Sequence, residues 1–362
     1  MAVPNPKLSL AMIVKNESRC LARCLQSVKG IVDEIVIADT GSTDDTPKIA
    51  RDFGAKVSNF GWVDDFAAAR NFSIAQSMGD WILILDADEW LGENLGKEIL
   101  IFRRGQPAVG RLKQVSDFRR HHQTFRSQCI VPRLFPRGGA HYEGRIHEQL
   151  ISPLPRANLR GELWHDGYLE IQKRSGRNMK LLVVELERDP DNVYFLFQLA
   201  LEYTSLGQTE KAFGCLQKAF TRAKPGDPLT PNIVVDFLYT SMELKKFEVG
   251  TEVVAQAEKD LGDFPDFFLV RGLFFMNLIR SNPAKYASEL PKIEQSFLRC
   301  LALGEEERRR SVHGSGTFLA NYNLGVYYQV FGNLAGARRC LETSLAQGYA
   351  PAAAQLKKFS AA

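Results

Sequence analysis

The chain has 362 residues, 45% hydrophobic and 24% charged, so it suits about two domains with an ordinary buried core rather than a disordered chain. A net charge of +4 is too small to indicate nucleic-acid binding, and the six scattered cysteines form no Cys-x-x-Cys pair, which disfavours zinc and redox motifs. No signal peptide or transmembrane segment is predicted, and the cysteine usage fits the reducing cytoplasm.

The first half of the chain alternates strand and helix patterns. Short, continuous apolar runs predict four strands, at residues 8–14, 33–39, 55–60 and 81–88. Helical patterns predict the helices between them, at residues 18–29, 44–53 and 64–78. This order predicts a parallel sheet with helices on both faces and a ligand site at the carboxyl ends of the strands.

The segment that follows, residues 101–145, is strongly basic, with ten Lys or Arg and only two acids, Asp117 and Glu143. Beside the carboxylates of the sheet edge, it suits a polyanionic substrate. A solvated basic face is an equally good interpretation. We expect loops here. His121-His122 within this segment is predicted to face solvent or an acceptor rather than a metal.

From about residue 178 strand patterns cease and helical periodicity continues to the end. The segments around Gly207 and Gly332 share spacing: each Gly has a small residue seven positions before it, a Tyr four before, an Ala five after and a Leu nine after. This spacing resembles the tetratricopeptide repeat, a helix-turn-helix unit of about 34 residues. Two weaker units are predicted at about 231–262 and 266–303. Ordinary helical hairpins are the alternative.

The sequence Ile82-Leu83-Ile84-Leu85-Asp86-Ala87-Asp88-Glu89 delivers carboxylates to the ligand edge of the sheet. Hard oxygen ligands suit Mg²⁺ or Mn²⁺, and such an ion neutralises a diphosphate as its bond to a sugar breaks. The alternative is that these acids cap the following helix.

Four amino-terminal motifs stand in a characteristic order: MIVKNES, DEIVIADTGSTDDT, DDFAAARN and GDWILILDADE. Over roughly residues 8–170 the sequence resembles the family 2 glycosyltransferases of the GT-A fold. The resemblance implies an α/β, Rossmann-like nucleotide-sugar-binding domain over residues 1–175. An all-α tetratricopeptide-repeat domain would follow over residues 176–362.

The resemblance also implies the roles of individual residues. Asp39 would accept the uracil N–H, Arg70 would approach the base or the diphosphate, and Asp86 would face the ribose or the sugar. The implied nucleotide-sugar contacts are Val14, Asn16, Glu17, Asp39, Thr40, Gly41, Arg70, Asp86 and Ala87. Arg70 has an alternative role as a helix-surface charge that pairs with Asp64 or Asp65.

The later segments RLFPRGGAHYEGRIHEQL and LWHDGYLE also resemble elements of repeat-bearing family 2 enzymes. Asp88 is the implied metal ligand, with His165 as a second and His147 as its reserve. An inverting transfer needs a base, and Glu148 is the candidate, with Asp166 in reserve. Glu148 could instead pair with Arg145 or Arg133.

The resemblance implies inverting, metal-dependent transfer of a hexose or N-acetylhexosamine from a UDP-sugar. Because repeat arrays form grooves for extended peptides, the expected acceptor is a peptide or protein side chain, as in the bacteriocin S-glycosyltransferase type. Transfer to a lipopolysaccharide core or another surface glycan is the alternative, and the repeats could form a homodimer interface. A catalytically dead repeat scaffold is the alternative from a different class.

Overall fold

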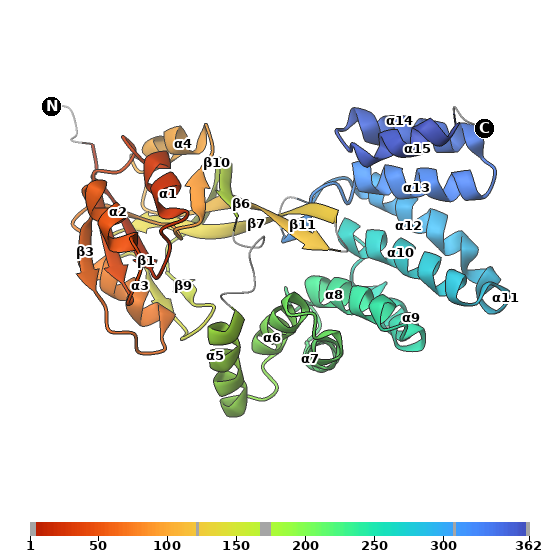
Figure 1. Cartoon of the computed structure of the whole chain (residues 1–362), viewed down its shortest axis with the longest axis horizontal. Coiled ribbons are helices and arrows are strands. Elements are labelled where there is room, and N and C mark those ends of the chain that lie inside the picture. Colours follow the sequence, from red (N-terminus) through yellow and green to blue (C-terminus); the bar gives the residue numbers. More distant parts are fainter. Residues whose placement is uncertain (1–4, 121–122, 167–174, 307–308, 360–362) are drawn as a thin grey trace. The chain divides into compact units, whose positions relative to one another are not determined.

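The computed structural model describes residues 5–120, 123–166, 175–306 and 309–359. The chain divides into two compact units, Met1–Ile171 and Gln172–Ala362, and we describe each by itself (Figure 1). The division predicted from the sequence, at residue 175, stays a prediction.

A mixed sheet forms the centre of the amino-terminal unit, with the order β3-β2-β1-β4-β7-β6-β10-β5. Its first four strands in this order are parallel, as the sequence predicts. Beyond these four predicted strands β7 runs antiparallel to β4, so the sheet as a whole is mixed. The strands are β1 (Leu8–Val14), β2 (Glu34–Asp39), β3 (Lys56–Asn59), β4 (Trp81–Ile84), β5 (Glu89–Leu91), β6 (Val109–Arg120), β7 (Gln123–Pro136) and β10 (Arg156–His165).

The basic segment, where loops were expected, contains the whole of the long antiparallel pair β6–β7. Its charged residues alternate with apolar ones, as in Arg111-Leu112-Lys113, and such alternation is typical of a half-buried strand. The paired strands β8 (His141–Glu143) and β9 (Gln149–Ile151) form a separate two-stranded sheet.

Helices cover both faces of the sheet, as predicted. On β1, Leu8, Leu10 and Met12 belong to one core, with residues of three helices: α1 (Leu21–Ser27), α2 (Thr46–Asp52) and α4 (Leu95–Phe102). Ala11 belongs to a second core, with Ala67 of α3 (Phe66–Ala75). Because successive side chains of a strand point to opposite faces, β1 buries residues in both layers.

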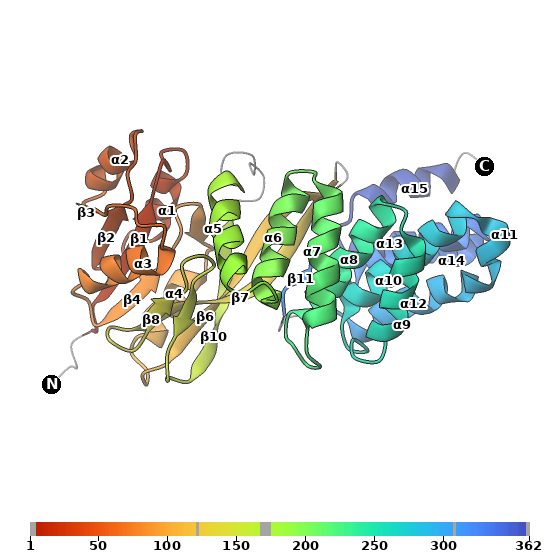
Figure 2. The ribbon, with the colours of Figure 1, turned by 90° about the horizontal axis from the view of Figure 1, so that it is seen from below.

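The carboxy-terminal unit is helical apart from the short strand β11 (Ser311–Val312). Neighbouring helices pack in chain order, and Figure 2 shows α6 and α7 side by side. The helices are α5 (Ser175–Arg188), α6 (Val193–Ser205), α7 (Thr209–Arg222), α8 (Thr230–Glu243), α9 (Phe247–Ala257), α10 (Pro265–Ser281), α11 (Pro283–Tyr286), α12 (Leu290–Leu303), α13 (Phe318–Val330), α14 (Leu334–Ala346) and α15 (Pro351–Phe359), with a 3₁₀ turn at Ala287–Glu289.

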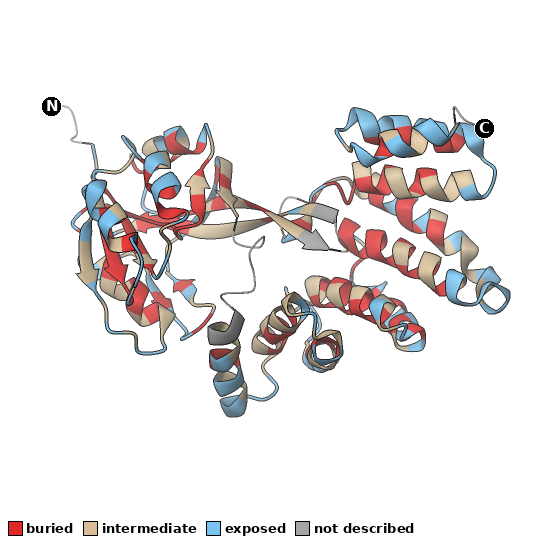
Figure 3. Cartoon of the chain, in the orientation of Figure 1, coloured by how far each residue is buried: buried red, intermediate tan, exposed pale blue. Residues whose placement is uncertain are grey.

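The repeat spacing has a direct packing explanation. Ala212 and Leu216 in α7, and Ala337 and Leu341 in α14, are fully buried at the same repeat positions. A side chain at Gly325 would meet Leu341 Cγ at 2.8 Å, so this position requires a small residue where the two helices of the hairpin touch. The predicted tetratricopeptide-type organisation is confirmed, and helices such as α14 carry both buried and exposed residues (Figure 3).

Within the described residues, no helix is long and apolar enough to cross a membrane. The long helix α10 contains the buried Arg271, whose guanidinium donates to Ser296 Oγ at 2.6 Å.

At the start of α10, Asp266 is buried, and its Oδ2 accepts a hydrogen bond from the N–H of Val312 at 2.8 Å. The pKa of Asp266 is raised to about 7, mainly by burial and also by the nearby charges of Glu305 and Glu306, while Ser315 and the Val312 N–H act in the opposite direction. The folded chain therefore favours the protonated carboxyl at this position.

The raised pKa predicts a pH-dependent stability. The carboxyl stabilises the fold fully below its unfolded pKa of about 4, and this stabilisation is lost as the pH rises through about 7, by at most about 4 kcal/mol. Asp266→Asn, which cannot ionise, should flatten the dependence. Urea unfolding followed by helical circular dichroism at acidic and basic pH measures this. Equal pH dependence of the variant and the wild type would contradict it.

Candidate active site at the carboxyl edge of the sheet

The loop after β2 ties together the ends of the first two strands. Thr40 N–H donates to the Val14 carbonyl at 2.9 Å, and Ser42 Oγ donates to Asp39 Oδ1 at 2.6 Å. Asn16, which adopts a positive φ of 57°, accepts the Thr43 N–H on its Oδ1 at 2.8 Å. Gly41 has a φ of 101°, which glycine adopts without strain. The carboxyl edge of the sheet is therefore lined here by Val14, Asn16, Asp39, Thr40 and Gly41.

Glu17 lies at the start of the same edge, where its N–H donates to Thr46 Oγ1 at 2.7 Å. Its carboxylate accepts a hydrogen bond from Cys20 Sγ at 3.2 Å. Since α1 begins directly afterwards, Glu17 belongs to the turn that joins β1 to this helix.

A tight turn carries the Asp86-Ala87-Asp88 motif between β4 and β5. The buried Glu89 closes this turn, because its Oε2 accepts the Asp86 N–H at 2.8 Å. Ala87 is buried beneath it. Helix α4 begins later, with Asn94 at its N-cap, so these carboxylates do not cap it. The capping alternative is therefore wrong.

Two buried arginines hold the carboxylates of this edge. Arg70 in α3 donates to Asp86 Oδ1 at 2.7 Å and also contacts Glu148 Oε1. Arg133 in β7 donates to Asp86 Oδ2 at 2.8 Å and to Glu89 Oε1 at 2.6 Å. The partners of Arg70 are therefore Asp86 and Glu148, whereas Asp65 caps α3 by accepting the Ala68 N–H.

The arginines set the charge of the motif. Burial alone would raise the pKa of Asp86, but the charges of Arg70 and Arg133 outweigh it and hold this pKa well below its usual value. Burial raises the pKa of Glu89 despite the opposing charge of Arg133. Asp86 is therefore a permanent anion, with both oxygens engaged by guanidinium groups.

The second carboxylate of the motif faces a histidine. Asp88 is 3% exposed, and its Oδ2 lies 3.5 Å from His165 Nε2 at the end of β10. The other ring nitrogen, Nδ1, lies 2.9 Å from Ser116 Oγ in β6, which orients the ring. Burial would lower the pKa of His165, but the hydrogen bond and charge of Asp88 raise it overall. The structure thus brings together residues 77 positions apart.

Asp166, directly after His165, forms ion pairs with Arg19 and Arg23 of the α1 region. Its backbone N–H donates to the Asp88 carbonyl at 3.3 Å, so the segment is anchored to the motif turn. His147 has a positive φ of 51°, and burial lowers its pKa. His121-His122 lies outside the described residues.

The sequence interpretation missed Arg133 and Glu89 as components of this site. The sequence gives Arg133 only as an alternative ion-pair partner of Glu148, and Glu89 only as the last carboxylate of the motif, with no role of its own. Gln114, whose Nε2 donates to Glu89 Oε1 at 2.5 Å, was not considered. The alternation of β7, which buries Arg133, was the available signal.

Removal of Arg133 should destabilise the fold strongly. Arg133→Met leaves the fully buried Glu89 without its guanidinium partner, and breaking such a buried pair costs about 3–5 kcal/mol. Urea unfolding at neutral pH measures this. Arg126→Met is the matched control, since it removes an exposed pair with Asp117 and should cost below about 1 kcal/mol. Equal losses for both variants would contradict the prediction.

The family model described as Glycosyl transferase family 2 matches residues 9–139. The prophage-derived glycosyltransferase SunS of Bacillus subtilis is 29% identical over 248 residues, which cover 60% of this chain and 54% of SunS. A TPR repeat-containing protein of Synechococcus elongatus is 58% identical over 85 residues, which cover 24% of this chain and 21% of that protein. The matches thus span about a fifth to about half of these relatives.

Among solved structures, glucosyl-3-phosphoglycerate synthase of Mycobacterium tuberculosis, in complex with Mn²⁺, UDP and phosphoglyceric acid, has a TM-score of 0.27. It is 22% identical, over 31% of this chain and 43% of that one. The family match contains the motif turn and both of its arginine partners. Residues 9–139 of this chain therefore resemble the family 2 glycosyltransferases in sequence, and a helical unit of tetratricopeptide-repeat type follows.

Proposed function

We propose that this chain is an inverting glycosyltransferase that moves a hexose or N-acetylhexosamine from a UDP-sugar to an acceptor. The observation that carries the proposal is the Asp88–His165 pair, 3.5 Å apart at the same sheet edge as Asn16 and Asp39. A carboxylate and an imidazole lie beside a rigid turn between two strand ends, where open α/β sheets bind nucleotides.

The donor atoms fit one divalent cation. Two ligands of Mg²⁺ or Mn²⁺ at about 2.1 Å lie about 3 Å apart when they are adjacent in an octahedral shell, close to the observed separation. No group of three or more His, Cys, Asp or Glu side chains in the described residues is arranged to hold a metal. We therefore assign two protein ligands, with diphosphate and water oxygens as the others. Such an ion stabilises the charge of the departing diphosphate.

The other residues of the sheet edge are assigned to binding the nucleotide and the sugar. Asp39, held by Ser42, is assigned to the uracil N–H, with Val14, Asn16, Glu17, Thr40 and Gly41 around the base and ribose. Asp86 is assigned to the ribose or the sugar, with Ala87 beneath it. Its pairing with Arg70 keeps Asp86 ionised, so that it accepts hydroxyl protons as an anion.

Glu148 is the proposed base that takes the acceptor proton. Its side chain is 10% exposed and contacts Arg70, which joins it to Asp86. Asp166 is the reserve. Because Arg70 touches both carboxylates, it couples the donor side of the site to the acceptor side.

We propose a peptide or protein side chain as the acceptor, because stacked helical hairpins present extended surfaces for polypeptides. A surface glycan is the second acceptor class. A homodimer formed through the repeats also belongs to this proposal.

Isothermal titration of the full chain with UDP tests the donor site. We expect UDP binding that strengthens in the presence of Mn²⁺ or Mg²⁺, and weaker binding of ADP and GDP. A screen of UDP-sugars by UDP release then identifies the sugar. Absence of UDP binding in the presence of the cation would favour the catalytically dead scaffold.

A further inference from the structure

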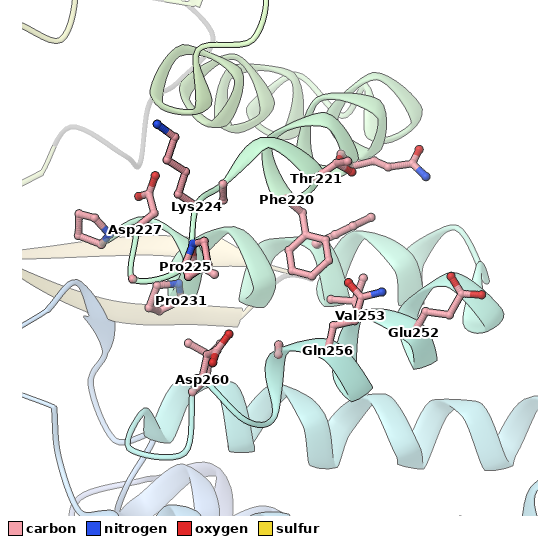
Figure 4. A pocket seen from close by; sticks show the side chains of 18 of the residues that line it. Phe220, Thr221, Lys224, Pro225, Asp227, Pro231, Glu252, Val253, Gln256 and Asp260 are labelled. Atoms are coloured by element: carbon pink, nitrogen blue, oxygen red, sulfur yellow. The ribbon is translucent and has the colours of Figure 1, made fainter.

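A cavity of about 650 Å³ lies within the helical unit (Figure 4). Its walls come from the end of α7, the loop before α8, and α9. Helices α7 and α9 are the second helices of two successive hairpins, α6–α7 and α8–α9. Helix α8 lies between them. The volume lies in the range of sites that take small molecules or a few residues of a peptide.

The floor of the cavity is apolar. Phe220 of α7 points toward Val253 of α9 (Figure 4). Phe237 and Val253 are buried. A flexible aliphatic chain that packs against these apolar side chains would remove its surface from water and make dispersion contacts with them.

Three of the five charged residues that line the cavity are acidic. Glu252, Gln256 and Asp260 are spaced by four residues on the α9 side, so they form one ridge along the cavity. Asp227 adds a carboxylate on the opposite side. None of these three carboxylates forms an ion pair with a described residue.

The two cations of the rim do not neutralise this ridge. Arg309 is occupied by Glu306, at 2.5 Å, and by Asp263, at 3.2 Å. Lys224 is exposed, and in Figure 4 its amine extends away from α9. The α9 side of the cavity therefore has a local excess of negative charge over an apolar floor.

We propose that this cavity binds a short basic segment of a polypeptide through an arginine or lysine side chain. The aliphatic stem lies on Phe220 and Val253, and the charged head meets either Glu252 or Asp260, as long cationic side chains bury their methylene groups and keep the head polar. Thr230 adds a polar group, since its Oγ1 is buried without a hydrogen-bond partner among the described residues. The site is separate from the sheet edge and does not depend on sugar transfer.

Fluorescence anisotropy with the full chain, without donor, tests this proposal. The probe is the fluorescein-labelled peptide Gly-Leu-Arg-Leu-Arg-Gly, and the reference peptide has glutamine in place of both arginines. We expect the arginine peptide to bind at least about tenfold more tightly, and added NaCl to weaken its binding. Equal affinity of the two peptides would overturn the proposal.

Variants locate the site. The double variant Glu252→Gln, Asp260→Asn should weaken binding of the arginine peptide about tenfold, and Gln256→Trp, which fills the mouth, should do the same. The matched control is Glu210→Gln with Glu342→Gln, two exposed carboxylates outside the cavity, which should stay within about twofold of wild type. Equal effects of the two double variants, or an unchanged affinity in the pocket variants, would show that the peptide does not bind here.

Discussion

Asp88→Ala should lower sugar transfer about a thousandfold or more, because it removes one of the two proposed protein ligands of the divalent cation. The remaining ligand, His165, is oriented by Ser116 but holds a cation only weakly by itself. Without the cation, the departing diphosphate keeps its full charge in the transition state. UDP release at saturating donor and Mn²⁺ is the measurement.

Two further variants separate the metal role from a structural one. Asp88→Asn keeps the shape of this buried side chain and should lose transfer as fully as the alanine variant, with an unchanged circular dichroism spectrum. Asp52→Ala removes an exposed carboxylate at the end of α2 and should leave transfer unchanged. Full turnover of Asp88→Ala in the presence of EDTA would disprove the metal assignment.

Glu148→Gln should lower transfer by about a hundredfold to ten-thousandfold while UDP binding stays within about threefold. Glutamine retains an oxygen that accepts the hydrogen bond from Arg70, but it cannot take the acceptor proton. The fold and the donor side are therefore preserved, and only the chemical step is affected.

The measurement pairs kcat from UDP release with isothermal titration of UDP. Asp166→Asn is the companion variant, since Asp166 is bound to Arg19 and Arg23 and should lower kcat much less than Glu148→Gln. Loss of UDP binding in Glu148→Gln would show that Glu148 supports the donor site instead. A larger loss of transfer in Asp166→Asn would move the base to the reserve position.

The arrangement of the strand ends was predictable because it follows from local patterns. The apolar runs of β1 and β4 can be interpreted only as buried strands. Because β1, β2 and β4 are parallel, Asn16, Asp39 and Asp86, which follow their carboxyl ends, meet at the same edge of the sheet. Likewise, the small residues at Ala200 and Gly325 mark close helix contacts wherever the spacing recurs. The sequence therefore determined both fold classes and the location of the candidate site.

Only the tertiary structure decided which charges pair within that site. Arg70 and Arg133 come from a helix and a distant strand, and both converge on Asp86, 16 and 47 residues away in the chain. Such pairing depends on sheet order and on which face a side chain occupies, and a strand pattern does not specify its neighbour. The long β6–β7 pair likewise depends on which strands lie next to each other, and a local sequence pattern does not specify this. The basic segment was therefore not predicted as strands.

The Asp86-Ala87-Asp88 motif shows both contributions. Its residue types and its position after a buried strand were sufficient to predict a carboxylate site for a nucleotide sugar. The distinct environments of its two aspartates, Asp86 between two guanidinium groups and Asp88 against an imidazole, arise from contacts across the fold. Identical side chains two positions apart differ because packing, and not sequence distance, sets their neighbours and their exposure to water.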